Sequence, residues 1–369
     1  MGKFSRAVTS LHFLAKRSLP LVLFLPLLLY ILAKEYWIQP SPKPSPTLKS
    51  TSPISMDLNT QLAYEFAPFL RLYKSGRVER FTGTQVVAAG TDEITGVPSK
   101  DVVIDRVTNL AARLYLPQST AKDEKLPILV YVHGGAFVIE SAFSPTYHRY
   151  LNSLVAKARI VAVSVEYRLA PEHPLPAAYD DAWQAVKWVV SNCSAGSGEA
   201  WLAEHGDPGR IFVAGDSAGG NIAHEIAIRA GSEKGARIRG LVLMNPYFWG
   251  KDPVGSETRD PGVRWTMEST WSFVCDGKYG IDHYLVNPFG HVDMWKGLGC
   301  QRVLVTVSEL DLFHERGVAY VEGLRKSGWT GEVEMYETKG EDHVYYLTYS
   351  NSKKALKELE VVSSFLNRP

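Results

Sequence analysis

The chain has 369 residues, of which 45% are hydrophobic and 21% are charged, and this composition is ordinary for a soluble protein that buries one large core or two modest ones. Its 40 basic and 39 acidic side chains leave a formal net charge of +1, so no overall field favours nucleic acid or an anionic membrane surface. A neutral or weakly polar small-molecule substrate is more consistent with this balance of charges than a nucleic acid or an anionic membrane. The cysteines Cys193, Cys275 and Cys300 match no metal or redox spacing, so we expect unpaired, buried thiols and no metal site.

The first 38 residues contain a basic stretch followed by an apolar one. Met1–Lys34 has no acidic residue and includes the apolar run Leu19–Ala33. At about 15 residues, this run is shorter than the roughly 20 needed to cross a bilayer and fits the apolar region of a signal peptide. If Tyr36, Trp37 and Ile38 complete the span at the interface, the same run anchors the chain in a membrane. We therefore predict a targeting or membrane-anchoring segment over residues 1–38.

A Pro/Ser-rich stretch from residue 39 to residue 55 separates this segment from the rest of the chain. Its composition predicts a stiff, extended linker. We place the folded domain at residues 56–369. Met56 would itself serve as a start, so two locations stay open: membrane-anchored or secretory if the first segment is used, and cytoplasmic if the working protein begins near Met56.

Within the folded domain, short apolar runs rich in β-branched residues alternate with longer amphipathic segments. The predicted strands are Ile128–Val132, Ile160–Val165, Ile211–Gly215, Leu241–Asn245, Val303–Val307 and Val333–Glu337. The predicted helices lie around Tyr147–Ala158, Tyr179–Val190, Ala218–Ala230, His314–Ser327 and Ser352–Leu366. This alternation predicts an α/β fold with a mostly parallel central sheet and helices on both of its faces.

Three segments do not follow this alternation. Lys100–Pro117 contains two strand-like runs joined by a polar turn, which predicts an antiparallel hairpin at one edge of the sheet. Leu58–Arg80 is amphipathic, and we predict it to be helical. Trp249–Pro288 is long, aromatic and interrupted by glycine and proline. We expect these last two segments to pack together as a helical cap over one end of the sheet.

The motif Gly215-Asp216-Ser217-Ala218-Gly219 joins a predicted strand to a predicted helix. It fits the pattern G-x-S-x-G, in which a tight turn holds a serine in a strained backbone conformation that only small neighbours permit. The helix N-terminus beneath the serine favours developing negative charge. A serine at this position is also a common helix N-cap, so the motif alone does not establish a nucleophile.

The sequence HGGA, which begins at His133, directly follows the predicted strand Ile128–Val132. Glycine amides in such a loop can face a substrate oxygen without a side chain in the way. In enzymes with the serine motif, this loop acts together with the amide of the residue after the nucleophile. We therefore predict an oxyanion hole made by the amides of Gly134, Gly135 and Ala218.

A serine nucleophile needs a base, which in this architecture comes last in the chain order serine, acid, histidine. Only His314 and His343 lie beyond the predicted strand Val303–Val307. His314 follows that strand too closely to swing back onto Ser217. We therefore predict that His343, in the loop after the last strand, takes the proton of Ser217.

The acid should emerge just after Val303–Val307, where Glu309 and Asp311 both stand. We favour Asp311, because a shorter carboxylate in the turn orients an imidazole more rigidly. Asp342 is a further alternative, but it adjoins His343 and would hardly reach the ring nitrogen. The predicted triad is Ser217, His343 and Asp311.

At these residues the sequence resembles the hormone-sensitive-lipase-like group of α/β-hydrolases, and within it the plant carboxylesterases. The matching motifs are HGGAF, VSVEYRLAPEHPLPAAYDD, GDSAGGNIAH, NPYFWG, SELD and GWTGEVEMYETKGEDH, which together cover nearly everything from Met56 onward. The resemblance implies an α/β-hydrolase fold and hydrolysis of small carboxylic esters without a metal or organic cofactor. It places the family's motif positions on Ser217, Asp311, His343 and the loop that begins at His133. Ala136 stands where a third glycine is common.

We therefore expect a carboxylic ester hydrolase that acts on small, apolar or aromatic esters through an acyl-enzyme. Aromatic residues near the motif loops favour such substrates; they are Phe137, Phe143, Tyr247, Trp249, Trp271 and Tyr345. Related enzymes with the same triad suggest two alternatives, a dehydratase of the hydroxyisoflavanone type and an intramolecular transacylase. A third alternative is a non-catalytic hormone receptor, but receptors of this family lack the histidine that His343 supplies. We expect no nucleic-acid partner, and the oligomeric state stays open.

Overall fold

The computed structural model describes residues 57–193, 196, 198–233 and 236–368. The predicted segment 1–38, with its proposed membrane association through Leu19–Ala33, and the predicted linker 39–55 lie outside the described residues. Within the part of the chain that is described, no helix is long and apolar enough to cross a membrane. Leu58–Pro369 forms one compact unit.

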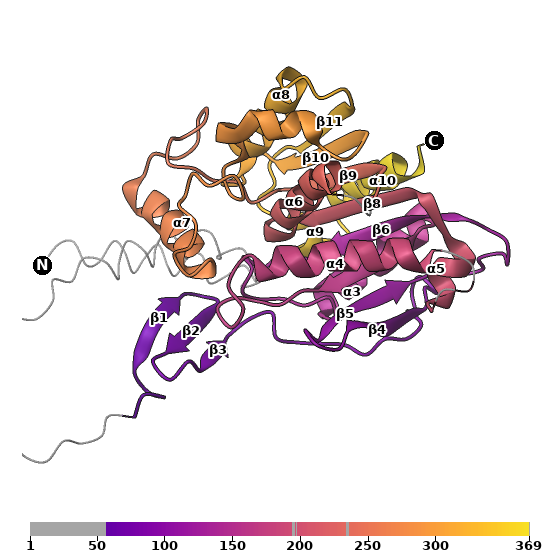
Figure 1. The fold of residues 1–369 in the computed structure, drawn as a ribbon, viewed down its shortest axis with the longest axis horizontal. Helices are drawn as coiled ribbons and strands as arrows, with labels where there is room; N and C mark the ends of the chain where they lie inside the picture. Colours follow the sequence, from indigo (N-terminus) through magenta and orange to yellow (C-terminus); the bar gives the residue numbers. More distant parts are fainter. Residues whose placement is uncertain (1–56, 194–195, 197, 234–235, 369) are drawn as a thin grey trace, which may run out of the picture. The chain divides into compact units, whose positions relative to one another are not determined.

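An eight-stranded sheet forms the centre of this unit (Figure 1), with the strand order β11-β10-β9-β8-β6-β7-β5-β4. Its strands are β4 (Ser99–Asp105), β5 (Leu110–Tyr115), β6 (Leu126–Val132), β7 (Val161–Glu166), β8 (Gly206–Asp216), β9 (Gly240–Met244), β10 (Arg302–Ser308) and β11 (Glu332–Thr338). All pairs from β11 to β7 are parallel, whereas β5 pairs antiparallel with both β7 and β4. The mostly parallel sheet and the hairpin at its edge are therefore confirmed.

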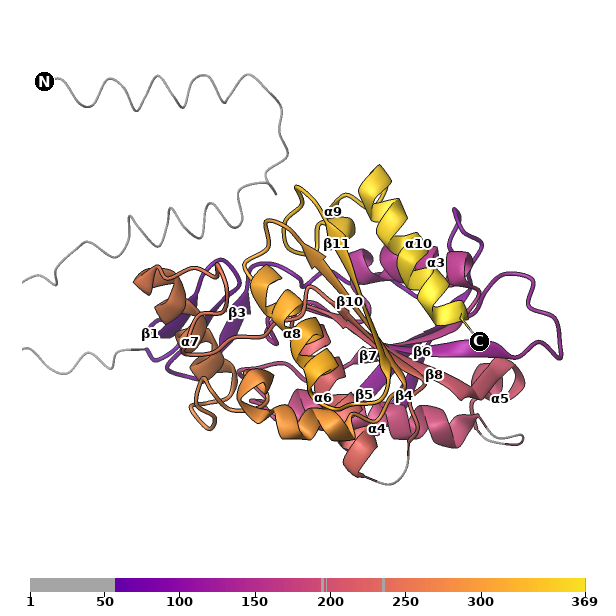
Figure 2. The ribbon, with the colours of Figure 1, turned by 90° about the horizontal axis from the view of Figure 1, so that it is seen from above.

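Helices cover both faces of the sheet, as Figure 2 shows. They are α3 (Pro145–Ala158), α4 (Ala177–Asn192), α5 (Ala200–His205), α6 (Ala218–Ser232), α8 (His314–Lys326), α9 (Tyr345–Thr348) and α10 (Lys353–Asn367). Successive residues of a strand point to opposite faces, so Val130 packs into the core under α4, α6 and α8. Its neighbours Leu129 and Tyr131 pack into the core under α3 and α10.

The prediction of a helix over Leu58–Arg80 is wrong. This segment forms a three-stranded antiparallel sheet of β1 (Leu62–Phe66), β2 (Leu70–Tyr73) and β3 (Val78–Arg80). Pro68 lacks the amide hydrogen that a helix interior requires. Gly76 turns the chain between β2 and β3 with a φ of 87°, a conformation that glycine adopts most readily.

The cap therefore combines strands with helix, rather than being helical throughout. Its mid-chain part contains α7 (Pro261–Val274) and, farther along, the 3₁₀ segment η2 (Pro288–Gly297). The Tyr64 ring of β1 stacks on the Phe273 ring of α7, with 4.2 Å between the ring centres. The two predicted cap segments thus pack together, as expected.

A buried ion pair fixes the first half of the mid-chain part to α8. Nε and Nη2 of Arg316 each donate to the Glu257 carboxylate at 2.9 Å, and neither side chain is more than 1% exposed. Nη2 of Arg316 also donates to the Asp252 carbonyl at 2.7 Å. Because a buried charge is stable only when paired, this contact specifies where the cap attaches to the sheet domain.

Candidate active site

Ser217 occupies the sharp turn between β8 and α6. Its φ of 51° and ψ of −120° lie outside the regions that residues with a Cβ favour. The flanking Gly215 and Gly219 allow the strand and helix to approach, since a Cβ on Gly219 would lie 2.0 Å from the carbonyl oxygen of Val132. The turn therefore presents Ser217 at the carboxyl end of the parallel strands, where ligands of such sheets bind.

Three of the predicted residues form one hydrogen-bonded chain. Nε2 of His343 lies 2.9 Å from Oγ of Ser217, and Nδ1 of His343 lies 2.9 Å from Oδ2 of Asp311. The Asp311 side chain is 1% exposed, while that of His343 is 28% exposed. A buried carboxylate thus orients an imidazole whose other nitrogen faces a serine hydroxyl.

The alternative acids and the alternative histidine have other partners. Glu309 accepts from the Gly340 amide at 2.8 Å and pairs with Lys339. Asp342 accepts from the backbone amide of His343 at 2.7 Å, and His314 lies 3.0 Å from Glu337. None of these contacts involves the Ser217 hydroxyl or the ring of His343.

Asp311 has a second donor that was not predicted. Nδ2 of Asn245 donates to Oδ2 of Asp311 at 2.8 Å and to Oγ of Ser308 at 3.1 Å. Asn245 follows β9 with a φ of 45°, so a strained backbone turns its amide toward the acid. The sequence held one signal, because the motif NPYFWG begins with Asn245 at the end of a predicted strand.

Asp311 also sets the protonation of His343. Burial lowers the pKa of His343, but the charge and hydrogen bond of Asp311 raise it, as do the charges of Asp216 and Asp342. The net effect is a pKa above the ordinary value of 6.5. His343 is therefore a stronger base than a free imidazole, as proton abstraction from a serine requires.

The prediction that the Gly134 amide binds an oxyanion is wrong. This amide donates to the Tyr147 hydroxyl at 2.8 Å and to Oδ1 of Asp216 at 3.1 Å, so it faces the interior. The amides of Gly135, Ala136 and Ala218 have no hydrogen-bond acceptor among the described residues. Gly135 and Ala136 have φ values of 103° and 52°, and this conformation leaves both amides available for a ligand.

His133 is a structural part of the loop. Its ring is fully buried, stacks on Tyr167 at 4.3 Å and lies with Nδ1 2.8 Å from the Gly134 carbonyl oxygen. Burial lowers the pKa of His133 to about 4, so the ring is neutral. It supports the loop and does not contact the Ser217 side chain.

Aromatic rings surround the hydrogen-bonded chain. The Tyr247 amide donates to the Ser217 carbonyl at 2.9 Å, and the Tyr247 ring lies 5.8 Å from Phe137 and 5.0 Å from Phe313. The Phe313 ring lies 5.3 Å from that of His343. These contacts give the site an apolar wall on the side of β9 and β10.

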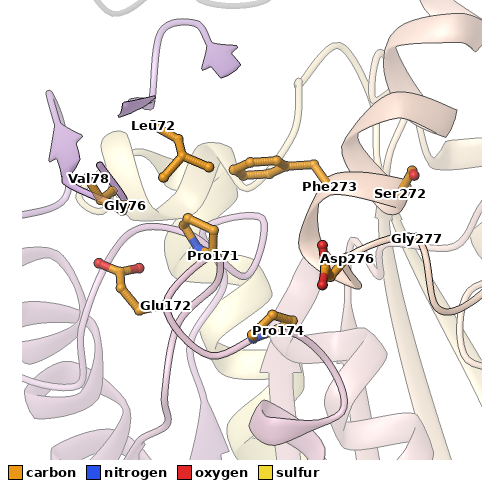
Figure 3. A pocket seen from close by; sticks show the side chains of 10 residues that line it. All are labelled: Leu72, Gly76, Val78, Pro171, Glu172, Pro174, Ser272, Phe273, Asp276 and Gly277. Carbon is orange, nitrogen blue, oxygen red and sulfur yellow. The ribbon is translucent and has the colours of Figure 1, made fainter. Parts of the chain in front are cut away.

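A groove of about 510 Å³ lies elsewhere, between the small sheet and the end of α7. Figure 3 shows the Phe273 ring directed toward Leu72, with Glu172 and Asp276 on separate walls. Its lining includes none of the predicted site residues. The groove is therefore distinct from the site around Ser217.

Cys193, Cys275 and Cys300 are free and buried. Among the described residues, no group of His, Cys, Asp and Glu is arranged to hold a metal ion.

Comparison with known proteins identifies the family. Residues 129–347 match a family model described as alpha/beta hydrolase fold. The chain is 44% identical over 311 residues to Probable carboxylesterase 2 of Arabidopsis thaliana, which covers 84% of this chain and 97% of that protein. It is 42% identical over 325 residues to 2-hydroxyisoflavanone dehydratase of Glycyrrhiza echinata, with 85% and 99% of the two chains covered.

A solved structure shares the architecture. The hyperthermophilic esterase from the archaeon Pyrobaculum calidifontis aligns with a TM-score of 0.59 and 28% identity, covering 73% of this chain and 84% of the esterase. The chain therefore belongs to the α/β-hydrolase-fold family, where it is a serine hydrolase of the plant carboxylesterase group.

Proposed function

We propose that the protein hydrolyses small, apolar or aromatic carboxylic esters. The observation that carries this proposal is the hydrogen-bonded chain from Ser217 through His343 to the buried Asp311. Ser217 attacks the ester carbonyl while His343 takes its proton and passes it to the leaving alcohol. Asp311 holds the imidazole in the required tautomer and stabilises its positive form. Water, activated by His343, then releases the acid from the acyl-enzyme.

The negative oxygen of the tetrahedral intermediate would bind the amides of Gly135, Ala136 and Ala218. The support is that these amides have no acceptor among the described residues and belong to the loop after β6 and to the first turn of α6, directly after Ser217. Loss of one such donor typically costs about 10²–10³ in rate. The apolar wall of Phe137, Tyr247 and Phe313 favours esters with apolar or aromatic groups.

A dehydratase is the second candidate, because 2-hydroxyisoflavanone dehydratase is 42% identical over almost its whole length. A panel of p-nitrophenyl acetate, phenyl acetate, a 2-hydroxyisoflavanone and a lactonising sugar ester separates the candidates. We expect the two simple esters to be hydrolysed, with the acid and the alcohol as products. Elimination of water from the isoflavanone without ester turnover would replace the proposal with a dehydratase, and lactone release would replace it with a transacylase. No turnover of any substrate would favour a non-catalytic receptor.

The pH dependence of kcat/KM should follow the protonation of His343. Its folded-state pKa lies above 6.5, and protonation removes the base, so kcat/KM should fall as the pH decreases through that value. We expect the midpoint of the acid limb above pH 6.5 for p-nitrophenyl acetate, measured between pH 5 and pH 9. In Asp311→Asn the limb should move to lower pH, because the main group that raises the pKa of His343 is removed. An acid limb at the same pH in both proteins contradicts this assignment.

We also propose that residues 1–38 form a targeting or membrane-anchoring segment. The basic residues before the apolar run Leu19–Ala33 support it. The test compares plant cells that express fluorescent fusions of the full chain and of a chain starting at Met56. We expect the full chain to enter a membrane or organelle fraction, and an identical cytosolic distribution of both fusions contradicts the proposal.

A further inference from the structure

The carboxylate of Asp216, next to Ser217, is buried and forms no salt bridge among the described residues, although the charge of His343 favours its charged form. It is 1% exposed and appears in no ion pair of the described chain. Oδ1 accepts from the Tyr131 hydroxyl at 2.8 Å, and Oδ2 accepts from the Tyr147 hydroxyl at 2.8 Å. Burial raises the pKa of Asp216 to about 6, although the two tyrosine hydrogen bonds favour the charged form. In the proposed reaction, Asp216 neither accepts nor donates a proton.

The same carboxylate contacts the loop that bears the proposed oxyanion amides. The Gly134 amide points between the Tyr147 hydroxyl, at 2.8 Å, and Oδ1 of Asp216, at 3.1 Å. A Cβ at Gly134 would lie 2.4 Å from Oδ2 of Asp216 and 3.1 Å from the Tyr147 hydroxyl. The backbone of the loop therefore packs directly against these two side chains, and only a glycine at position 134 permits that approach.

The hydrogen bond from the Gly134 amide to Asp216 connects the ends of two neighbouring strands, β6 and β8. Asp216 is one peptide from Ser217, and Gly134 is one peptide from Gly135. Their strands, β6 and β8, are paired up to Val132 and Gly215. Any shift of the Gly134 amide thus changes where the amides of Gly135 and Ala136 lie relative to the serine oxygen.

We propose that Asp216 and Tyr147 are positioning residues that hold the oxyanion loop in register with Ser217. The proposal rests on the proposed function, in which Ser217 attacks and the loop amides bind the oxyanion. Stabilisation by an oxyanion hole depends on donors fixed before the reaction, and a misplacement of about 1 Å can cost about 10²-fold in rate. The effect should appear in kcat rather than in KM, because the oxyanion forms only in the transition state.

The chain offers a matched control in Tyr131. Both tyrosines are buried, at no more than 2% exposure, and both donate to Asp216 at 2.8 Å. Only Tyr147 also accepts from the Gly134 amide. Replacing either tyrosine by phenylalanine removes one donor from the carboxylate, but only Tyr147→Phe removes a support of the loop.

The experiment compares Tyr147→Phe, Tyr131→Phe and Asp216→Asn in the full chain. For p-nitrophenyl acetate we expect Tyr147→Phe to lower kcat by about 10- to 100-fold with KM within about threefold, as the loss or displacement of oxyanion donors implies. Tyr131→Phe should change kcat by less than about threefold, although both tyrosine variants should lose similar thermal stability. Asp216→Asn should lower kcat at least as much as Tyr147→Phe. The NH2 group of the asparagine would face groups that donate to the carboxylate in the wild type, namely the tyrosine hydroxyls and the Gly134 amide.

A second measurement detects the loop itself. Phenylboronic acid adds to a catalytic serine and places an oxygen where the oxyanion forms, so its inhibition constant reports the amides directly. We expect it to rise by about tenfold or more in Tyr147→Phe and to stay within about threefold in Tyr131→Phe. Equal kcat values and inhibition constants in the two tyrosine variants overturn the positioning role. Turnover by Ser217→Ala above one part in 100 of wild type would instead overturn the proposed function, so the two failures are distinguishable.

Discussion

Ser217→Ala is expected to lower kcat for p-nitrophenyl acetate by about 10⁶-fold, the loss typical when a serine of a catalytic triad is removed. The alanine keeps the Cβ and the backbone bonds of the turn, in which the residue 217 amide donates to Met244 and its carbonyl accepts from Tyr247. Only the oxygen that lies 2.9 Å from His343 is removed. The measurement is steady-state turnover of purified protein, with thermal unfolding to show that the variant is folded.

Ser272→Ala serves as the control for this variant. Ser272 lines the groove between the small sheet and α7 and is not part of the hydrogen-bonded chain. Its replacement should leave kcat and KM within about twofold, as for a surface change away from the chemistry. Turnover by Ser217→Ala above one part in 100 of wild type would require another nucleophile and would end the proposed mechanism.

Asp311→Asn is expected to lower kcat by about 10⁴-fold, which is the effect of this substitution in triads of the same geometry. Nδ1 of His343 donates to the Asp311 carboxylate at 2.9 Å. An asparagine amide can instead donate to that nitrogen and hold the imidazole in the wrong tautomer. Nδ2 of Asn245 donates to the same oxygen at 2.8 Å. An amide NH2 group placed there would therefore face two hydrogen-bond donors.

Glu309→Gln and Asp342→Asn are the controls for the choice of acid. Glu309 bonds to Gly340 and Lys339, and Asp342 bonds to the His343 backbone. We expect both variants to keep kcat within about threefold, because neither carboxylate touches the imidazole ring. A larger loss in either control than in Asp311→Asn would reassign the acid.

The elements nearest the chemistry could be predicted because their signals are local. The buried strands β6, β8 and β10 are short apolar runs, and each ends at a loop that carries a residue of the site. Chain order then restricted the base to His343, since His314 follows its strand too closely. The strands, the serine turn and the loop of the acid therefore follow from patterns within a few residues, whereas the base follows from its place in the chain order.

The errors concern contacts between distant segments. Which amide of the HGGA loop faces inward depends on Tyr147, 13 residues away, and on Asp216, 82 residues away. Asn245 meets Asp311 across 66 residues of sequence. Over Leu58–Arg80 the apolar residues fit a helical face, but Pro68 and the packing of Tyr64 on Phe273 favour strands.

The insertion between β9 and β10 leaves the sheet and returns to it on neighbouring parallel strands. It leaves at Asn245, at the carboxyl end of β9, and re-enters at Arg302, at the amino end of β10, so its two attachment points lie at opposite edges of the sheet. Asn245 donates to Ser308 and Asp311, at and just after the carboxyl end of β10. Of the insertion, its first residue thus bonds to the acid, whose other hydrogen-bond partners, Phe313 and His343, lie after β10. Caps exchanged between related enzymes after Asn245 and before Arg302 should transfer substrate choice while leaving the proton relay intact, so that selectivity can be engineered as a separate module.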